Sequence, residues 1–445
     1  MEWYFALAFL LSLVLFFMFI GVPVALAFLA ANMIGAVYFM GGSGDLMTQM
    51  ARGIGQLSSN AIPTVTTFNL MPVPMFLLMG EIFFYTGLAT RMFSAVDKLM
   101  GKIPGRLSFV TVAGGTAFAT LSGSSMGSTA LLGSLMVPEM QKRGYKKHMS
   151  IGPILGTGGL AMLVPPSALA VLLATLANLD VGKLLIAGVV PGLMLACFYA
   201  ILILIMCLID PDAAPPYDVE PTSWLQRGKL LLFDVVPMVS IVIGVILLIL
   251  NGWSTPSESA AFGCLGVLLL AALYGKLTWE AFLNSVTGAL KVTVMALLII
   301  FGSATFSALL AFSGASSGLI GWATSFDLQP LSMLIIMFCI LLILGMFMDQ
   351  LSMMLLTVPI FFPLAQTLGF DLIWFGVIVL LALEISFTTP PFGLLLFVMK
   401  GVSTPDTTMR DIYVAALPFM GCAIVLVGLL IVWPEIATWL PSFSK

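Results

Sequence analysis

Two polar clusters interrupt long apolar stretches of the chain, and each is followed by a proline pair. The first proline pair is Pro165–Pro166 and the second is Pro390–Pro391. Proline removes an N–H donor and pushes the residue before it out of helical geometry, so carbonyl oxygens lose their partners at each pair. Such oxygens, together with hydroxyls and carboxylates, suit a dehydrated cation such as Na+. The hydroxyls and carboxylates of the two clusters belong to Ser122, Ser124, Ser125, Asp349 and Ser352.

The two clusters belong to a repeat with an offset of 225 residues. Pro138, Gly144 and the first proline pair are spaced by 6 and 21 residues. Pro363, Gly369 and the second proline pair have the same spacings, and the first polar cluster falls opposite residues 347–350. Proline-interrupted apolar segments at corresponding places in two halves indicate the binding site of a transporter.

The composition excludes several other classes of protein. The chain of 445 residues is 60% hydrophobic and 8% charged, whereas about 25% of the residues of an ordinary globular protein are charged. We therefore expect an all-α polytopic membrane protein. A net charge of −3 with no basic stripe argues against a nucleic-acid partner. The five cysteines form no CxxC pair and there is one histidine, so no transition-metal cluster is expected.

We expect the chain to cross the membrane ten times and to dip into it twice more. A crossing needs about 20 apolar residues. Segments 106–142 and 330–366 are too long for one crossing and have polar middles, which predicts two re-entrant helical hairpins. The proline pairs then fall within two discontinuous helices, residues 148–178 and 371–400. The other expected crossings are 4–21, 24–40, 64–89, 184–209, 230–251, 256–274, 284–313 and 411–433.

Basic residues predict that the two hairpins open to opposite faces of the membrane. Eight Lys or Arg residues flank the first hairpin, from Arg91 to Lys147, whereas residues 314–330 and 364–371 beside the second hairpin contain none. Cytoplasmic loops are rich in Lys and Arg, so the first hairpin should open to the cytoplasm and the second to the outside. The halves would then form an inverted-topology repeat, with both termini on the outer, periplasmic face.

Each half is expected to combine a scaffold part with a transport part that carries the hairpin and the discontinuous helix. An interfacial helix is expected within residues 41–62, and residues 210–229 have the composition of a cytoplasmic linker. The expected boundaries are 1–63 (scaffold part of the first half), 64–192 (transport part of the first half), 193–229 (connecting helix and linker), 230–283 (scaffold part of the second half), 284–433 (transport part of the second half) and 434–445 (C-terminal tail).

We predict one cation site in each half, built from a hairpin tip and the facing helix break. The positive ends of the half-helices that start near residues 127, 167 and 393 would face the same central cavity and favour an anion such as a carboxylate. The predicted cation ligands are Ser122, Ser124, Val164, Pro165, Asp349, Ser352, Thr388 and Thr389. The predicted substrate-binding residues are Ser124, Ser125, Gly127, Ser167, Thr389 and Gly393.

Two further acids lie in apolar segments. Glu384, six residues before the second proline pair, is a candidate coupling residue: a proton carrier, a cation ligand or a packed carboxylate. Proton coupling through Glu384 is the alternative to Na+ coupling. For Glu81, packing is the preferred interpretation, with Lys291 as a candidate partner.

Two other classes of function account less well for these features. Residues 123–127 match the G-x-S-x-G pattern of serine hydrolases, which requires a strand–turn–helix setting and a reachable base. The setting here is helical and His148 falls in the basic cytoplasmic region, so no enzyme is expected. A channel would place its ligands in symmetric rings around a pore, whereas this repeat is inverted and lies within one chain.

Several motifs extend over nearly the whole chain: 122–125, 138–145, 165–167, 187–192, 255–258, 344–349, 389–393 and 417–419. They resemble the large membrane subunit (DctM-like large permease) of tripartite ATP-independent periplasmic (TRAP) transporters. The resemblance implies a Na+-coupled, elevator-type importer of organic anions in the bacterial inner membrane, whose mobile domain carries both hairpins. It also implies a small four-helix membrane subunit and a periplasmic binding protein. The implied substrate is a carboxylate, either a dicarboxylate, a keto or hydroxy acid, or a sugar acid, and the chain would contact membrane lipid.

Overall fold

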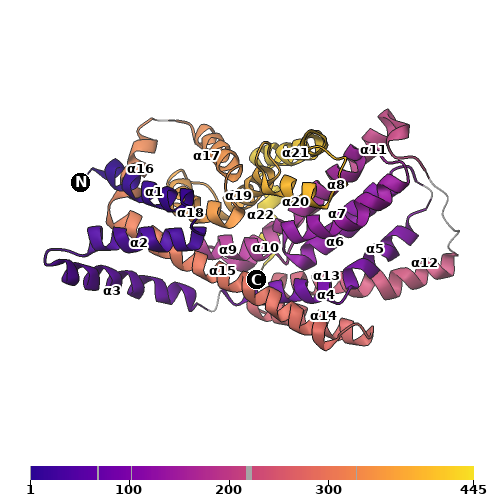
Figure 1. The fold of residues 1–445 in the computed structure, drawn as a ribbon, viewed down its shortest axis with the longest axis horizontal. Coiled ribbons are helices and arrows are strands. Elements are labelled where there is room, and N and C mark those ends of the chain that lie inside the picture. The colour runs from indigo at the N-terminus through magenta and orange to yellow at the C-terminus, as the bar shows by residue number, and fades with distance from the viewer. Residues whose placement is uncertain (1, 68–69, 102, 217–222, 327, 445) are drawn as a thin grey trace.

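The computed structural model describes residues 2–67, 70–101, 103–216, 223–326 and 328–444. Within these ranges the regular structure is helical throughout, with no strand, as Figure 1 shows. The expected all-α architecture is therefore confirmed for this part of the chain.

The helices of the two halves follow one another in similar order. In the first half they are α1 (Trp3–Phe19), α2 (Val24–Met40), α3 (Leu46–Val65), α4 (Pro72–Tyr85), α5 (Leu88–Leu99), α6 (Arg106–Ser122), α7 (Ser125–Lys142), α8 (Lys147–Gly159), α9 (Ala168–Leu176), α10 (Val181–Ala187) and α11 (Val189–Ile209). In the second half they are α12 (Trp224–Leu230), α13 (Val236–Leu250), α14 (Pro256–Leu273), α15 (Trp279–Phe312), α16 (Ala315–Thr324), α17 (Pro330–Gly345), α18 (Gln350–Thr367), α19 (Leu372–Phe387), α20 (Leu394–Val402), α21 (Met409–Val432) and α22 (Glu435–Thr438). A π-helical turn (Leu231–Val235) joins α12 to α13, and a short 3-10 turn (Leu160–Met162) follows α8.

Length and apolar composition make six of the described helical segments long enough to cross a membrane, and the bent pair α4–α5 would add a seventh. Three sequence-based boundaries differ from the structure. The helix expected within 41–62 spans Leu46–Val65 (α3), and the crossing expected at 64–89 is shortened to α4. The expected linker 210–229 includes residues 217–222, which lie outside the described residues. Its last part is already helical, because Gln226 accepts from Ser223 N at 3.1 Å and so caps the start of α12.

The repeat seen in the sequence is also a structural repeat. Shifting the bounds of α7 by 225 residues gives those of α18, and the same shift takes the start of α8 to the start of α19. Gly144 (φ 80°) and Gly369 (φ 77°) turn the chain between these helices in the left-handed region, which glycine adopts without steric cost. Both proline pairs contain a cis peptide bond.

The two halves run in opposite directions relative to α21. Lys147, at the start of α8, donates to Asp411 at the beginning of α21, at 3.0 Å. Trp374, near the start of α19, donates from Nε1 to the carbonyl oxygen of Leu430 at the end of α21, at 2.7 Å. Equivalent helices therefore begin at opposite ends of one long helix, as an inverted repeat requires.

Two connecting helices, α5 and α16, lead from the first helices of each half into its hairpin. Gly87 and Gly314, both with φ 72°, precede these helices, and α5 is bent by 66° from α4. α16 packs on α1, whereas α5 packs on the turn at Leu231–Val235. Each connecting helix thus rests on the opposite half.

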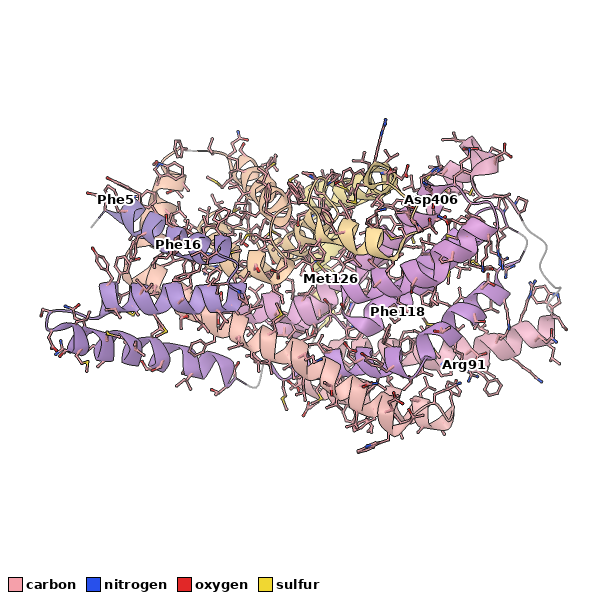
Figure 2. The ribbon with its side chains drawn as sticks, viewed as in Figure 1. Phe5, Phe16, Arg91, Phe118, Met126 and Asp406 are labelled. Carbon is pink, nitrogen blue, oxygen red and sulfur yellow. The ribbon has the colours of Figure 1, made fainter. Side chains whose placement is uncertain are left out.

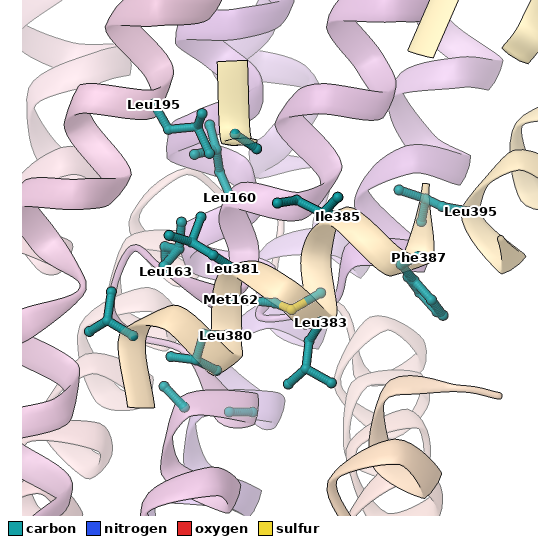
Figure 3. Packing of buried hydrophobic residues seen from close by; sticks show 14 of the residues in the cluster. Leu160, Met162, Leu163, Leu195, Leu380, Leu381, Leu383, Ile385, Phe387 and Leu395 are labelled. Carbon is teal, nitrogen blue, oxygen red and sulfur yellow. The ribbon is translucent and has the colours of Figure 1, made fainter. Parts of the chain in front are cut away.

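The hairpins α6–α7 and α17–α18 lie in different parts of the molecule, as Figure 1 shows, and the 3-10 turn at the first break packs on α19, which leads into the second break. Leu160, Met162 and Leu163 beside the first break belong to the same buried cluster as the apolar residues of α19 between Leu380 and Phe387 (Figure 3). Gln350, at the second hairpin tip, donates from Nε2 to Met162 Sδ at 3.5 Å. Close packing of this kind holds helices together in a membrane, where lipid competes for apolar contact.

Candidate substrate and cation site

A cavity of about 320 Å³ lies where the two hairpin tips meet the helices α4 and α15. Its walls come from the first tip (Ser124, Ser125), the second tip (Asp349), the start of α9, and the facing surfaces of α4 and α15. Met126, which also lines the cavity, lies near the middle of the molecule in Figure 2. This central cavity unites segments from both halves of the chain, so it is the strongest candidate for the binding site.

The first hairpin tip touches the first helix break. α6 ends at Gly123 (φ 59°), and Ser124 caps α7 by accepting from Gly127 N at 3.1 Å. A Cβ added to Gly123 would lie 3.7 Å from Ala168 N and 4.0 Å from the carbonyl oxygen of Pro166. Ser125 is 3% exposed, and its hydroxyl has no hydrogen-bond partner among the described residues. A buried hydroxyl left without a partner costs free energy, so a ligand in the cavity would satisfy it.

The second tip places Asp349 at the position equivalent to Ser124, and it too is a helix cap. Its carboxylate accepts from Leu351 N at 3.1 Å and from Ser352 N at 3.2 Å, and the Ser352 hydroxyl also donates to it. A carboxylate offers about four acceptor positions, so Asp349 retains capacity for a cation while it caps α18. The second tip touches its own break through Phe347 and Phe392, whose ring centroids lie 5.6 Å apart.

At the breaks, several predicted residues form local hydrogen bonds. Ser167 caps α9 by accepting from Ala170 N at 3.2 Å. Thr388 and Thr389 both donate to the carbonyl oxygen of Ile385, at 3.0 and 2.6 Å. Position 393 requires glycine, because a Cβ there would lie 2.6 Å from the carbonyl oxygen of Phe387 and 2.9 Å from the carbonyl oxygen of Thr389.

The structure therefore brings together only part of the predicted set. Among the described residues, the predicted residues that line the central cavity are Ser124, Ser125 and Asp349. The others lie next to the tips or at the breaks and are not among its lining residues; they are Gly127, Val164, Pro165, Ser167, Ser352, Thr388, Thr389 and Gly393. The side chain of Ser122 lies outside the described residues.

Packing was the preferred interpretation of Glu81 from the sequence, but its side chain also faces the central cavity. Glu81 lines the central cavity from α4, and its Oε2 would lie 2.8 Å from a Cβ on Gly288 of α15. Within the described part of the chain, no ion pair joins it to Lys291. The sequence signal for a functional role of Glu81 was the presence of an acidic residue within an apolar crossing.

The ionisable side chains that line the central cavity are all acidic among the described residues. Glu81 and Asp349 both face it, and no Lys or Arg is among its described lining residues. Most of the remaining wall is apolar, with Leu77, Leu172 and Met295 as examples. Two carboxylates in a poorly solvated site repel an anion strongly unless cations offset them.

Glu384 lies in a second, separate cavity. It is 4% exposed, and Tyr199 of α11 donates to its Oε1 at 3.3 Å. Its Oε2 has no hydrogen-bond partner among the described residues. The cavity beside it, of about 10 Å³ and lined by Gly156, Thr388 and Phe419, is large enough for about one water molecule.

The fold and the central cavity define a polytopic membrane protein of the transporter class. The chain matches the family described as tripartite ATP-independent periplasmic transporter, DctM component, over residues 11–436. It is 33% identical over 394 residues to the C4-dicarboxylate TRAP transporter large permease protein of Pseudomonas aeruginosa, covering 88% of each chain. It is 27% identical over 398 residues to the sialic acid TRAP transporter large permease protein of Vibrio cholerae, covering 89% of this chain and 92% of the relative.

A solved structure shares the fold. The Alcanivorax borkumensis YdaH transporter superposes with a TM-score of 0.67 at 13% sequence identity, covering 93% of this chain and 99% of that one. The chain thus belongs to the DctM family of TRAP transporter large permeases, and the expected resemblance is confirmed. These relatives are transporter permeases rather than enzymes, which supports the assignment of this chain as a membrane transport protein.

Proposed function

We propose that this chain is the large subunit of a Na+-coupled importer that moves a small organic anion across the bacterial inner membrane. The observation that carries the proposal is the pair of carboxylates, Glu81 and Asp349, facing a cavity with no basic residue among its described lining. An anion binds there only when cations have offset both charges. Substrate binding and cation binding are then coupled, which is what a symporter requires.

The cations bind at the two hairpin tips, one in each half. The equivalence of Ser124 and Asp349 supports this arrangement, because both cap the second helix of a hairpin and both line the central cavity. The unpartnered hydroxyl of Ser125 and the carbonyl oxygens at the breaks supply further oxygen ligands. An all-oxygen site that is partly built from backbone suits Na+ better than a transition metal.

Transport proceeds by an elevator motion in which the hairpins and breaks move together. The 3-10 turn beside the first break packs on α19, which leads into the second break, and this contact supports movement of the two breaks as one body. Gly87 and Gly314 have left-handed backbones, and a Cβ at either position would meet nothing within 4 Å. These residues precede α5 and α16 and are suited to act as hinges between the long helices α4 and α15 and the hairpins that follow them. The hairpins re-enter the membrane from opposite faces, and both termini are periplasmic.

The substrate is a small carboxylate delivered by a periplasmic binding protein, and a small four-helix membrane subunit completes the complex. The tripartite family and the relatives named for C4-dicarboxylates and sialic acid support these assignments. The cavity, at about 320 Å³, suits a small molecule with an apolar body.

The test is uptake by proteoliposomes that contain the complete complex. Candidate carboxylates are first identified by a ligand screen on the binding protein. Uptake should require an inward Na+ gradient and should stop when choline replaces Na+. Unchanged uptake in choline would contradict Na+ coupling.

Proton coupling through Glu384 is the alternative, and one observation favours it. A buried carboxylate oxygen without a partner beside a cavity the size of one water is an arrangement suited to proton exchange. If uptake in choline follows an imposed proton gradient, and Glu384→Gln abolishes that uptake, the alternative replaces the Na+ mechanism.

A further inference from the structure

A second large pocket lies outside the central cavity, between α5 and the turn that joins α12 to α13. This pocket, the basic pocket, has a volume of about 540 Å³. The side chains that matter for its chemistry are Thr90, Arg91, Ser94, Lys98, Asp234 and Lys276. It holds three cations against one carboxylate, together with two hydroxyl donors, which is the chemistry that a phosphate group requires.

One cation of the basic pocket is held in place. Arg91 forms an ion pair with Asp234, and its guanidinium lies 4.0 Å from the centroid of the Tyr274 ring. Lys98 and Lys276 are exposed and form no ion pair within the described part of the chain. Their charges therefore remain available to an anion that enters the pocket.

The surroundings of the basic pocket match the boundary between lipid headgroups and acyl chains. Leu232 and Phe233 on the turn next to Asp234 are 59% and 57% exposed, and Leu273 at the end of α14 is 81% exposed. Trp224, at the start of α12, is 86% exposed and is of the residue type that concentrates at membrane interfaces. A phosphate in the pocket would thus have apolar surface beside it for its acyl chains.

The repeat shows that the fold does not require a basic pocket here. The equivalent helix α16 carries no charged residue. It presents Trp322 to Trp3 of α1 instead, with ring centroids 6.3 Å apart. In Figure 2 Arg91 lies in the same half of the view as Asp406, in the loop contacted by Lys147. The basic pocket therefore lies toward the same end of the molecule as the loop contacted by Lys147, and Arg91 and Lys147 belong to the Lys- and Arg-rich segments expected to face the cytoplasm.

We propose that the basic pocket binds the headgroup of an anionic glycerophospholipid from the cytoplasmic leaflet. Basic pockets between membrane helices on the cytoplasmic side are suited to such headgroups. The phosphate contacts Lys98, Lys276 and the hydroxyls of α5, and the acyl chains lie along the exposed apolar turn. Because α5 connects α4 to the first hairpin, the bound lipid restrains the link between α4 and that hairpin.

The experiment measures lipid binding to the purified full chain by its apparent melting temperature in detergent. The probes are cardiolipin, phosphatidylglycerol, phosphatidylcholine and inorganic phosphate. Cardiolipin and phosphatidylglycerol should raise the melting temperature, whereas phosphatidylcholine and inorganic phosphate should leave it nearly unchanged. The same rise with phosphatidylcholine, or with inorganic phosphate, would overturn the lipid assignment.

A paired variant tests the location. Lys98→Gln with Lys276→Gln should weaken binding of the anionic lipids roughly thirtyfold, since each basic residue near an anionic surface contributes about 1 kcal/mol. Both side chains are exposed, so the melting temperature without lipid should not change. Lys142→Gln with Lys183→Gln, two exposed lysines outside the pocket, is the matched control and should bind like the unaltered chain. Equal lipid binding by the two paired variants would overturn the proposal.

Discussion

Gly159 and Glu384 occupy equivalent positions in the two halves of the chain, and they meet in the core. Any Cβ on Gly159 would overlap Oε1 of Glu384. Residues related by a two-fold axis meet only near that axis, so this contact locates the pseudo-two-fold axis of the inverted repeat between α8 and α19. The axis thus passes through the packed helices beside the two breaks.

This contact predicts an overpacking defect. Gly159→Ala should lower the free energy of unfolding by about 1–3 kcal/mol, because the added methyl group displaces the Glu384 carboxylate. Gly421→Ala is the matched control, since a Cβ on that helical glycine would meet nothing within 4 Å. The control should be neutral or more stable by up to about 1 kcal/mol. The melting temperatures of the two variants in detergent are compared; equal values would contradict the contact.

Asp349 has two roles that different substitutions separate. Asp349→Ala removes both the cap of α18 and the charge, and should cost about 1 kcal/mol of stability. Asp349→Ser restores the type of cap that Ser124 provides in the first half, so stability should recover while Na+-dependent uptake stays impaired. If the Asp349→Ser variant takes up substrate at low Na+ as fast as the unaltered chain, the charge of Asp349 has no part in coupling.

Glu81 should contribute to the Na+ requirement from α4, which forms one wall of the central cavity. Glu81→Gln keeps the shape of the side chain and removes its charge, so one fewer charge has to be offset when the anion binds. The Hill coefficient of uptake against Na+ concentration should fall by roughly one. Glu435→Gln, at the start of α22 and away from the cavity, is the control. An unchanged Hill coefficient in Glu81→Gln would remove Glu81 from the mechanism.

An ion pair between Lys146 and Asp210 predicts a pH effect on stability. The hydrogen bond from Lys146 lowers the pKa of Asp210 from its usual value of 3.8. Because the folded pKa lies below the unfolded one, the stabilisation is present above pH 3.8 and is lost as the pH falls through the folded value. Asp210→Asn should therefore lower the melting temperature at neutral pH, and the difference should shrink in acid. Asp212→Asn is the control; an equal effect of both variants would argue against the pair.

The repeat was predictable because proline and glycine restrict the backbone locally. Gly144, Gly369 and the two proline pairs fix turns and breaks without help from distant residues. The tips were predictable for a similar reason, since Ser124 and Asp349 are typical helix caps.

The membership of the cavity wall was harder to predict, because it depends on how distant helices pack. Glu81 reaches the cavity only because α4 and α15 pack beside the tips, and periodicity does not reveal that contact. The sequence predicted Thr388 and Thr389 as cation ligands, but their hydroxyls donate to the carbonyl oxygen of Ile385 one turn earlier. The sequence repeat shows that Gly159 and Glu384 are equivalent, but it does not give the distance between them. Their contact depends on how the two halves pack around the two-fold axis.

In the proposed mechanism, cations bind among the carboxylates and hydroxyls at the hairpin tips before the anion does. The most direct measurement is the melting temperature of the purified chain in NaCl against choline chloride at equal ionic strength, without substrate. The melting temperature should rise saturably with Na+ concentration, and Asp349→Ser should greatly reduce that rise. Identical melting curves in the two salts would contradict it.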